Sequence, residues 1–273
     1  MSRVALVTGG GGAIAEQIAL RLDARGYDLV LADIARLRME AVAARLSRPP
    51  TLVDCDLASL DGIRELAGRI ERDHADLSLL VNNAGYIEPG DITDVSADDV
   101  DRHVLVNLVA PMQLTRAAAR GMATRGGGDI LAIVSMGGII ALRGSASYAA
   151  SKFGLRGFHT SIQQELGARG VRVMGVFPSG VDTPMLRKEA AHPSGSPLNF
   201  VGTVLSPEQI GDACMKALDT GKLETYVPYT DSITTRVFGA FPWLIRRVEP
   251  AVAKVGERGR AKYLARIAGA NGV

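Results

Sequence analysis

The chain has 273 residues, of which 47 % are hydrophobic and 22 % are charged. Both fractions are close to those of ordinary globular proteins, so long disordered regions and fibrous repeats are excluded. The formal net charge of +2 gives no global field to attract nucleic acid, and we expect no nucleic-acid partner. The two cysteines, Cys55 and Cys214, are too few for a disulfide framework or a thiolate metal cluster, which favours a reducing cytoplasm.

The apolar runs of the sequence do not predict a signal peptide or a membrane span. The segment Val4 to Val7 is too short an apolar run for a signal peptide and leads into glycines. The longest uncharged stretch, Ile130 to Leu142, is shorter than the ~18 apolar residues that a membrane span needs. We therefore expect a soluble cytoplasmic protein without a targeting segment.

Short apolar runs alternate along the chain with longer segments of helical period. Apolar side chains three or four residues apart, as in Ile14-Ile18-Leu22 and Ile63-Leu66-Ile70, form one face of a helix. The alternation predicts an α/β fold of the Rossmann type, a doubly wound, seven-stranded parallel sheet with helices on both faces and a single domain over 1–273. The expected strands are 4–7, 28–32, 51–53, 77–81, 129–134, 171–177 and 224–227.

The stretch from about 184 to 206 breaks this pattern. It contains Pro184, Pro193 and Pro197 and shows no clear period. Loops of this length in compact domains are usually functional. We expect a long loop here that acts as a substrate lid.

The other exception is a basic and aromatic C-terminal extension at about 231–273. It places Phe238, Phe241 and Trp243 next to Arg246 and Arg247. Three interpretations compete: a lid over a lipophilic substrate, a contact between subunits, or an amphipathic segment on an anionic membrane surface. The first two are favoured over the membrane contact. Gly239 and Pro242 are expected to interrupt any single helix through this extension.

A glycine-rich turn follows the first strand and opens the first helix. Glycines allow the backbone to turn tightly and approach a pyrophosphate, whose charge the free N–H groups of a helix N-terminus hold. The alternative is an ordinary strand-to-helix turn, which the context of four consecutive glycines disfavours. The candidate phosphate-binding residues are Gly9, Gly11, Gly12, Ala13 and Ile14.

An acidic residue, Asp33, stands at the end of the second strand. A carboxylate about 20 residues past such a turn accepts hydrogen bonds from the adenosine ribose and repels a 2′-phosphate. This favours NAD over NADP as the cofactor, although Arg36 and Arg38 follow closely and would soften the preference. The alternative is a helix cap or a loop charge.

The strongest chemical signal is a tyrosine and a lysine four residues apart, Tyr148 and Lys152, with Ser135 upstream at the end of a predicted strand. On a helix the first two share one face. A free tyrosine has a pKa near 10, and a fall of about three units, on the order of 4 kcal/mol, would poise it for proton transfer. We expect Lys152 to lower the pKa of Tyr148, and Ser135 to hydrogen-bond the substrate oxygen. A tyrosine and a lysine four residues apart on a helix are, without further signals, usually surface residues with no catalytic role.

These residues resemble the short-chain dehydrogenase/reductases, in the compact subfamily of about this length. The likeness covers roughly residues 3 to 228. It includes the turn from Thr8 to Ala15 and the acid at Asp33, and it continues through Asp56-Leu57, Asn82-Asn83-Ala84-Gly85, Asn107, Ser135, Tyr148, Lys152 and Pro178-Ser179-Gly180-Val181-Asp182-Thr183.

The resemblance implies a catalytic tetrad of Asn107, Ser135, Tyr148 and Lys152, and oxidoreductase activity with a nicotinamide cofactor. Asn107 would position a water molecule of a proton relay, with a structural kink as the alternative, and Lys152 would also hold the nicotinamide ribose. The implied cofactor-binding residues further along the chain are Asp56, Leu57, Asn83, Ala84, Gly85, Pro178, Val181 and Thr183. Members are commonly homodimers or homotetramers, with the helices at 98–124 and 148–168 as the expected contacts.

Three positions depart from the family pattern. Ala13 and Ala15 stand where glycine is usual, and Ser179 replaces the glycine after Pro178. Alanine is accepted at the last position of such a turn, where the helix packs closely on the sheet. A methyl group at Ala13 would weaken dinucleotide binding or shift the contact to Gly12.

The substrate pocket is expected beyond the carboxyl ends of the strands. Its candidates, Met136, Leu142, Arg143 and Met185, are mostly apolar, which favours a lipophilic or aromatic alcohol or ketone. Arg143 is either an anchor for an acid or simply an exposed arginine. The histidines show no metal-ligand spacing, so no metal is expected, and each is interpreted as solvated or capping.

Two functions of different classes follow. The favoured one is an NAD-dependent enzyme that interconverts a secondary alcohol and a ketone, with Tyr148 as the acid/base. The other is a non-catalytic dinucleotide-binding sensor or scaffold on the same fold. Ala13 alone supports the second, since the tyrosine and the lysine are both present. A sugar-nucleotide epimerase would need a larger substrate domain than the chain provides after residue 184.

Overall fold

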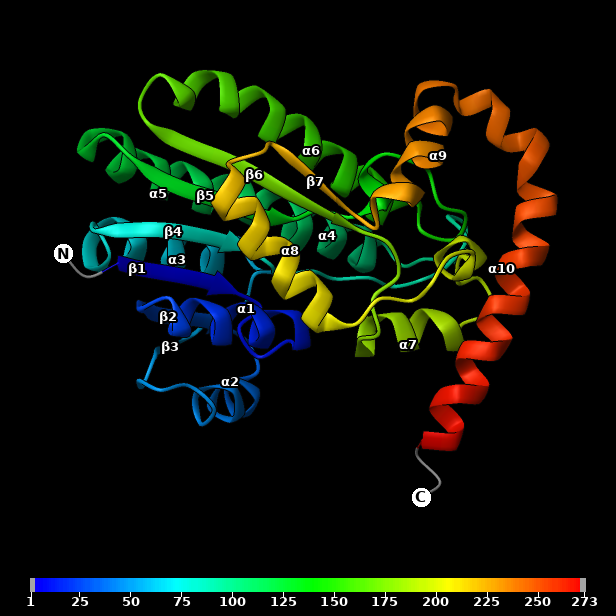
Figure 1. Ribbon diagram of the computed structural model, residues 1–273, viewed down its shortest axis with the longest axis horizontal. Coiled ribbons are helices and arrows are strands. Elements are labelled where there is room, and N and C mark those ends of the chain that lie inside the picture. Colours follow the sequence, from blue (N-terminus) through cyan, green and yellow to red (C-terminus); the bar gives the residue numbers. More distant parts are fainter. Residues whose placement is uncertain (1–2, 271–273) are drawn as a thin grey trace.

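The structure of the protein is a computed structural model that describes residues 3–270. Seven parallel strands form one sheet in the order β3-β2-β1-β4-β5-β6-β7, as Figure 1 shows. The predicted seven-stranded, doubly wound α/β fold is therefore confirmed. The strands are β1 (Arg3–Thr8), β2 (Tyr27–Asp33), β3 (Thr51–Asp54), β4 (Leu77–Asn82), β5 (Gly128–Ile133), β6 (Val171–Pro178) and β7 (Glu224–Val227).

Helices cover both faces of the sheet, because every parallel crossover must pass over one face. One face is covered by α1 (Ala13–Ala24), α2 (Arg36–Ala43) and α8 (Pro207–Thr220). On the other lie α3 (Leu60–Asp73), α4 (Ala97–Val104), α5 (Ala110–Arg125) and α6 (Ala146–Gly167). The strands are nearly all apolar because both of their faces are buried.

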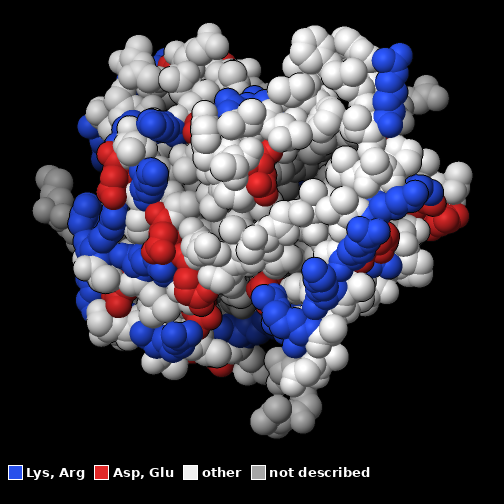
Figure 2. All heavy atoms as spheres, turned by 45° about the vertical axis from the view of Figure 1, so that its right-hand side comes forward, with Lys and Arg blue, Asp and Glu red and all other residues white. Residues whose placement is uncertain are grey.

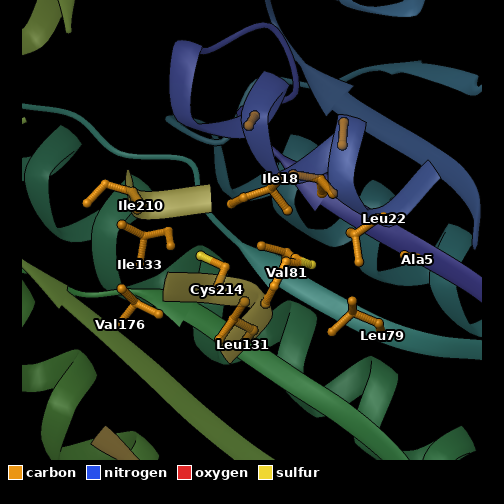
Figure 3. Close-up of a cluster of buried hydrophobic side chains, with 14 of the residues drawn as sticks. Ala5, Ile18, Leu22, Leu79, Val81, Leu131, Ile133, Val176, Ile210 and Cys214 are labelled. Carbon is orange, nitrogen blue, oxygen red and sulfur yellow. The ribbon is translucent and has the colours of Figure 1, made fainter. Parts of the chain in front are cut away.

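The first of these cores fixes α1 against the sheet. Ile18 and Leu22 of α1 pack with Ile210 and Cys214 of α8 over the central strands, and all four are fully buried (Figure 3). Ala15 is fully buried as well, in agreement with its expected role in close helix-to-sheet packing. The N-terminus of α1 is thereby held at the carboxyl end of β1.

The order of the strands reverses between β1 and β4. From β1 the chain moves outward through β2 to β3, and from β4 it moves the other way to β7. Loops at such a switch point diverge to opposite faces and leave a crevice beyond the carboxyl ends of the strands. The predicted cofactor and catalytic residues follow these strand ends.

The structure corrects the prediction of a long loop at 184–206. Residues Pro184–Ala191 form a helix, α7, and Pro197–Phe200 form a 3₁₀ turn, η3. Thr183 caps α7 through its side chain, and Pro184 occupies the first helical position, where a missing N–H costs nothing. Two helical turns are too short to show a period in the sequence.

The C-terminal extension forms two helices, α9 (Tyr229–Ala240) and α10 (Pro242–Ala270). The break at Phe241 agrees with the interruption expected at Pro242, whereas Gly239 lies inside α9. In Figure 1 α10 runs past η3 and α7 along one side of the molecule. None of the helices within residues 3–270 combines the length and the apolar composition that a membrane span requires.

Glycines allow α10 to lie directly on η3. A Cβ atom at Gly256 would stand 2.1 Å from the carbonyl oxygen of Pro197, and one at Gly259 would stand 2.0 Å from that of Phe200. Further along α10, the buried Tyr263 donates its hydroxyl to Asp182 Oδ1 at 2.7 Å. The extension is thus attached to the segment that follows β6.

Candidate active site

The glycine-rich turn between β1 and α1 has the backbone form that a phosphate-binding loop requires. Gly9 has φ +65°, and a Cβ atom there would stand 2.9 Å from Ala84 Cα, so only glycine fits. Gly12 is the N-cap of α1 and offers no side-chain cap, so the first-turn N–H groups at Ala13 and Ile14 lack helical partners. The turn therefore presents backbone donors and the positive end of the helix dipole to an anion.

The carboxylate of Asp33 lies against this turn. Its Oδ2 accepts from the backbone N–H of Gly11 at 2.9 Å, and its Oδ1 accepts from Ala35 N–H at 3.0 Å. Arg36 is engaged elsewhere, with Glu40 and Asp54. Arg38 is exposed, and its Cβ lies 2.6 Å from where a Cβ of Gly11 would be. Of the two arginines, Arg38 is the one beside the turn.

The end of β4 is attached to the turn through Thr8. The Thr8 hydroxyl accepts from the backbone N–H groups of Asn83 at 3.0 Å and Ala84 at 3.1 Å. The Asn83 side chain returns a hydrogen bond from Nδ2 to the Thr8 carbonyl at 2.9 Å. These contacts hold Asn83, Ala84 and Gly85 beside the glycine-rich turn, on the predicted cofactor path.

The other predicted cofactor residues also follow strand ends. After β3, Asp56 Oδ1 accepts from Ala58 N–H at 2.9 Å and Leu57 is buried. Pro178 ends β6, Val181 pairs with Leu205 in an isolated bridge, and Thr183 caps α7. Pro178, Val181 and Thr183 line the same cavity as Tyr148.

Three of the predicted catalytic side chains meet in that cavity, which has a volume of about 120 Å³ and is lined by Ser135, Tyr148 and Lys152. The Ser135 and Tyr148 side chains are neighbours, since a Cβ atom at Gly137 would stand 3.3 Å from Ser135 Oγ and 3.2 Å from the Tyr148 ring. Lys152 Nζ lies 5.8 Å from the centre of the Tyr148 ring and donates to the carbonyl of Ile133 at 3.0 Å. Ile14 and Asn83 line the cavity too, so it opens on the glycine-rich turn. We name it the inner cavity.

Ser135 is held in a strained backbone conformation. It has φ 146° and ψ 156°, a region that glycine alone occupies freely, and it is the single non-glycine residue with positive φ among residues 3–270. Its Oγ accepts from Gly137 N–H at 2.9 Å. Strain of about 1–3 kcal/mol persists where the surroundings impose it, which is typical of functional sites.

Burial dominates the ionisation of the tyrosine and the lysine. It raises the pKa of Tyr148 above its ordinary value, with the Ser135 hydrogen bond acting in the opposite direction and the nearby Glu189 carboxylate raising it further. Burial also lowers the pKa of Lys152 to about 8. The expectation that Lys152 lowers the pKa of Tyr148 has no support from these residues alone, because burial dominates the shift and Lys152 is not among the groups that contribute to it. It stays a prediction for the complex with an oxidised, positively charged nicotinamide.

Asn107 lies in a π-helical turn, Leu105–Val109, between α4 and α5. Its amide is fully engaged: Nδ2 donates to Tyr86 O at 2.9 Å and to Ser151 Oγ at 3.2 Å, and Oδ1 accepts from Tyr86 N–H at 2.8 Å. The side chain therefore joins the loop after β4 to α6, in a helix that is locally widened. Single π-helical turns are frequent at functional sites. A role in positioning water stays a prediction.

A second cavity of about 280 Å³ adjoins the inner one and has an apolar lining that includes Met136 and Leu142. We name it the outer cavity. Met185 lines the inner cavity, whereas Arg143 is exposed and lines neither, so the structure favours the exposed arginine over the acid anchor. The two cavities share six lining residues, Ser135, Leu142, Pro178, Ser179, Gly180 and Asn199.

The C-terminal extension forms one wall of the outer cavity. Phe238 of α9 and Val252 of α10 line it, together with Asp231, Thr234 and Thr235. Phe241 and Trp243 are exposed instead. Figure 2 shows a hollowed and largely uncharged surface in this region, with basic side chains along α10. Because Phe238 lines the outer cavity, its position agrees with the interpretation of this extension as a lid over the substrate.

Sequence reasoning missed two polar residues of the inner cavity, Glu189 of α7 and Asn199 of η3. Asn199 Nδ2 donates to Glu189 Oε1 at 3.0 Å. Burial raises the pKa of the Glu189 carboxyl to about 7. The sequence carries no signal for them, because the stretch that contains both has no clear period and predicts a loop.

One histidine was interpreted wrongly. His159 of α6 is neither solvated nor capping: it is buried, neither ring nitrogen has a partner among the described residues, and burial lowers its pKa to about 4. His103 is buried too, but its Nε2 caps the backbone N–H of Glu88 at 3.0 Å. Within residues 3–270, no group of three His, Cys, Asp or Glu side chains is arranged to hold a metal ion.

Comparison with known proteins identifies one family. The family model described as short chain dehydrogenase matches residues 3–194. Nodulation protein G of Rhizobium meliloti is 36 % identical over 186 residues, which cover 68 % of this chain and 76 % of the relative.

Solved structures agree with this match. A bulky-bulky ketone specific alcohol dehydrogenase from Comamonas testosteroni has a TM-score of 0.75 at 26 % identity and covers 89 % of this chain and 94 % of its own. A short-chain dehydrogenase from Sphingobium yanoikuyae in complex with NADPH has a TM-score of 0.76 at 26 % identity, with 89 % and 95 % covered.

Proposed function

The chain belongs to the short-chain dehydrogenase family, and from that premise we propose that it is an NAD-dependent oxidoreductase that interconverts a lipophilic or aromatic secondary alcohol and the corresponding ketone. Membership of the family makes it an oxidoreductase that acts on CH–OH groups with a nicotinamide cofactor. The observation that carries the proposal is the meeting of Tyr148, Ser135 and Lys152 in a cavity that opens on the glycine-rich turn.

The residues around the crevice fit a dinucleotide. The uncapped N-terminus of α1 faces the pyrophosphate position, and Asp33 lies beside it for the ribose hydroxyls. When bound, the nicotinamide supplies or accepts the hydride. Val181 and Thr183 line the inner cavity, where they would contact the carboxamide, and Lys152 would contact the ribose.

Two side chains of the inner cavity have different roles in the reaction. Ser135 donates to the substrate oxygen and holds the carbinol carbon in place, so that the hydride travels a short, aligned path. Tyr148 gives its hydroxyl proton to that oxygen during reduction and takes it back during oxidation. Burial excludes water and strengthens both interactions, since the local dielectric constant is low.

We propose NAD as the preferred cofactor because the Asp33 carboxylate would repel a 2′-phosphate. Arg38 beside the turn acts in the opposite direction, and solved relatives contain NADPH or NADP. The carboxylate is hydrogen-bonded to the turn through Gly11 N–H, whereas Arg38 lies beside the turn through its Cβ atom.

The substrate proposal rests on the outer cavity. Its lining is mostly apolar, and α9 and α10 close one side of it. An apolar cavity that adjoins the catalytic residues suits a bulky ketone, and the Comamonas testosteroni relative is described as bulky-bulky ketone specific.

A spectrophotometric screen tests this proposal. Hydrophobic and aromatic secondary alcohols and ketones are offered with NAD(H) and NADP(H) in parallel, and absorbance of the reduced nicotinamide is followed. We expect turnover of bulky aromatic substrates with higher kcat/KM for NAD(H). A higher kcat/KM with NADP(H) would refute the role of Asp33, and turnover of small hydrophilic alcohols alone would refute the substrate class.

A further inference from the structure

We propose that Glu189, Asn199 and Ser179 form a hydrogen-bonding subsite that binds a second polar group of the substrate, a hydroxyl on a carbon close to the reacting carbonyl. This inference rests on the proposed function, since it names the substrate class more closely as a hydroxy ketone or the corresponding diol. It is carried by polar atoms placed where the two cavities meet.

Glu189 is a carboxyl group buried in the wall of the inner cavity. It is 6 % exposed, yet it takes part in no ion pair among the described residues. Within residues 3–270, its single side-chain hydrogen bond comes from Asn199 Nδ2 to Oε1, which leaves Oε2 without a side-chain donor there. A buried carboxyl group without a cation is costly, and the stability of the fold gives no reason to keep it.

The hydroxyl group of Ser179 is a second, independent observation in favour of the subsite. Its hydroxyl oxygen is buried and has no hydrogen-bond partner among the described residues, at a position that lines both cavities. A buried hydroxyl without a hydrogen-bond partner destabilises the fold, so a ligand group that satisfies it is favoured.

The three residues come from elements that pack against one another. The Asn199 carbonyl lies 2.6 Å from where a Cβ of Gly180 would be, so η3 rests on the segment after β6. The Asn199 side chain then crosses to α7 and meets Glu189. All three side chains line the inner cavity with Ser135 and Tyr148.

The reacting group and the subsite are close enough to act on one substrate. Glu189, Ser135 and Tyr148 line one cavity of only about 120 Å³. A substrate whose carbonyl oxygen meets Ser135 and Tyr148 would therefore have the carbons close to its carbonyl within reach of Glu189. The larger, apolar part of the molecule extends into the outer cavity.

The subsite is tested with matched pairs of ketones. 2-Hydroxyacetophenone is compared with acetophenone, and 3-hydroxy-1-phenylpropan-1-one with propiophenone, by kcat/KM with NADH. We expect the wild-type protein to prefer the hydroxylated member of at least one pair. Assayed at pH 8, where a carboxyl group with a pKa of about 7 is mostly ionised, Glu189→Gln should lower the preference about tenfold or more, since a hydrogen bond to a charged group is lost. In Ser179→Ala the preference should fall about threefold.

The ratio of kcat/KM for the two members of a pair isolates the effect of the added hydroxyl group. Glu189→Gln also changes the surroundings of Tyr148, but that effect acts equally on both members of a pair and cancels in the ratio. Asp231→Asn is the matched control, because Asp231 lines only the outer cavity. Loss of the preference in Asp231→Asn with retention in Glu189→Gln would overturn the proposal.

Equilibrium binding distinguishes failure of the subsite from failure of the proposed function. Calorimetry with the protein saturated with NAD⁺ measures binding of the same ketones without turnover. Tighter binding of a hydroxylated probe that Glu189→Gln abolishes supports the subsite even where no ketone is reduced. Equal binding of both members, or binding of neither, overturns it.

Discussion

The ionisable groups of the inner cavity are shaped by burial more than by one another. Burial raises the pKa of Tyr148, raises that of Glu189 to about 7 and lowers that of Lys152 to about 8. Each shift favours the neutral form, as expected for a site with little water. Carboxyl, phenol and ammonium groups held this way are typical of catalytic sites.

Glu189 makes the stability of the protein depend on pH. Its folded-state pKa of about 7 lies above the unfolded value of 4.5, so the folded protein holds a proton that the unfolded chain releases between these values. Stability from this group is therefore lost as pH rises from about 5 to 7, by about 3 kcal/mol in total. Tyr148 and Lys152 of α6 line the same cavity and titrate above this window.

We predict that Glu189→Gln removes this dependence. The variant should match the wild type in free energy of unfolding near pH 4.5 and exceed it above pH 7, because it has no buried carboxyl group to ionise. Urea unfolding followed by circular dichroism over pH 4.5–8 measures the difference. A difference that stays constant over this range would show that Glu189 ionises freely in the folded protein.

At the scale of elements, the cover of the pocket is a stack of α7, η3 and α10. Asp182, at the start of the segment that leads into α7, accepts from Tyr263 and pairs with Arg187 and Arg266. Gly259 brings the backbone of α10 against η3. Since η3 carries Asn199 and α10 carries Val252, this packing fixes one wall of both cavities.

Gly259→Ala should disturb that wall. The added methyl group would stand 2.0 Å from the carbonyl oxygen of Phe200, so α10 must move away from η3. We expect a loss of about 1–3 kcal/mol in stability and a higher KM for bulky ketones. Gly269→Ala is the control, because its methyl group would meet no atom within 4 Å. Equal melting temperatures and KM values for the two variants would contradict the close contact.

At the scale of the whole molecule, local sequence patterns predict the strands of the sheet but do not predict the segments that cover the pocket. Seven apolar runs predicted seven strands because a parallel sheet is buried on both faces. The glycine-rich turn, Ser135, Tyr148 and Lys152 were found because each has a fixed place after a strand or on one helix face. Glu189, Asn199 and Val252 were not found, because only tertiary packing brings α7, η3 and α10 to the site.

The assembly of the molecule stays a prediction. A groove between α5 and α6, lined by Met112, Phe158 and Ile162, lies on the helices expected to form subunit contacts. Met112 is 39 % exposed. We expect a homodimer or homotetramer in light scattering after size-exclusion chromatography, and a smaller species for Met112→Asp. The same substitution at the exposed Ile92 should leave the mass unchanged. A monomeric wild type would refute this interface.

The central claim is that Tyr148 is the acid/base of an oxidoreductase. Its most direct test is Tyr148→Phe, which removes one hydroxyl group and keeps the packing of the ring. We predict that kcat for ketone reduction falls by about 10²–10⁴-fold, while the Kd for NADH, measured by fluorescence, changes less than about threefold. Turnover at the wild-type rate with unchanged cofactor binding would contradict the claim.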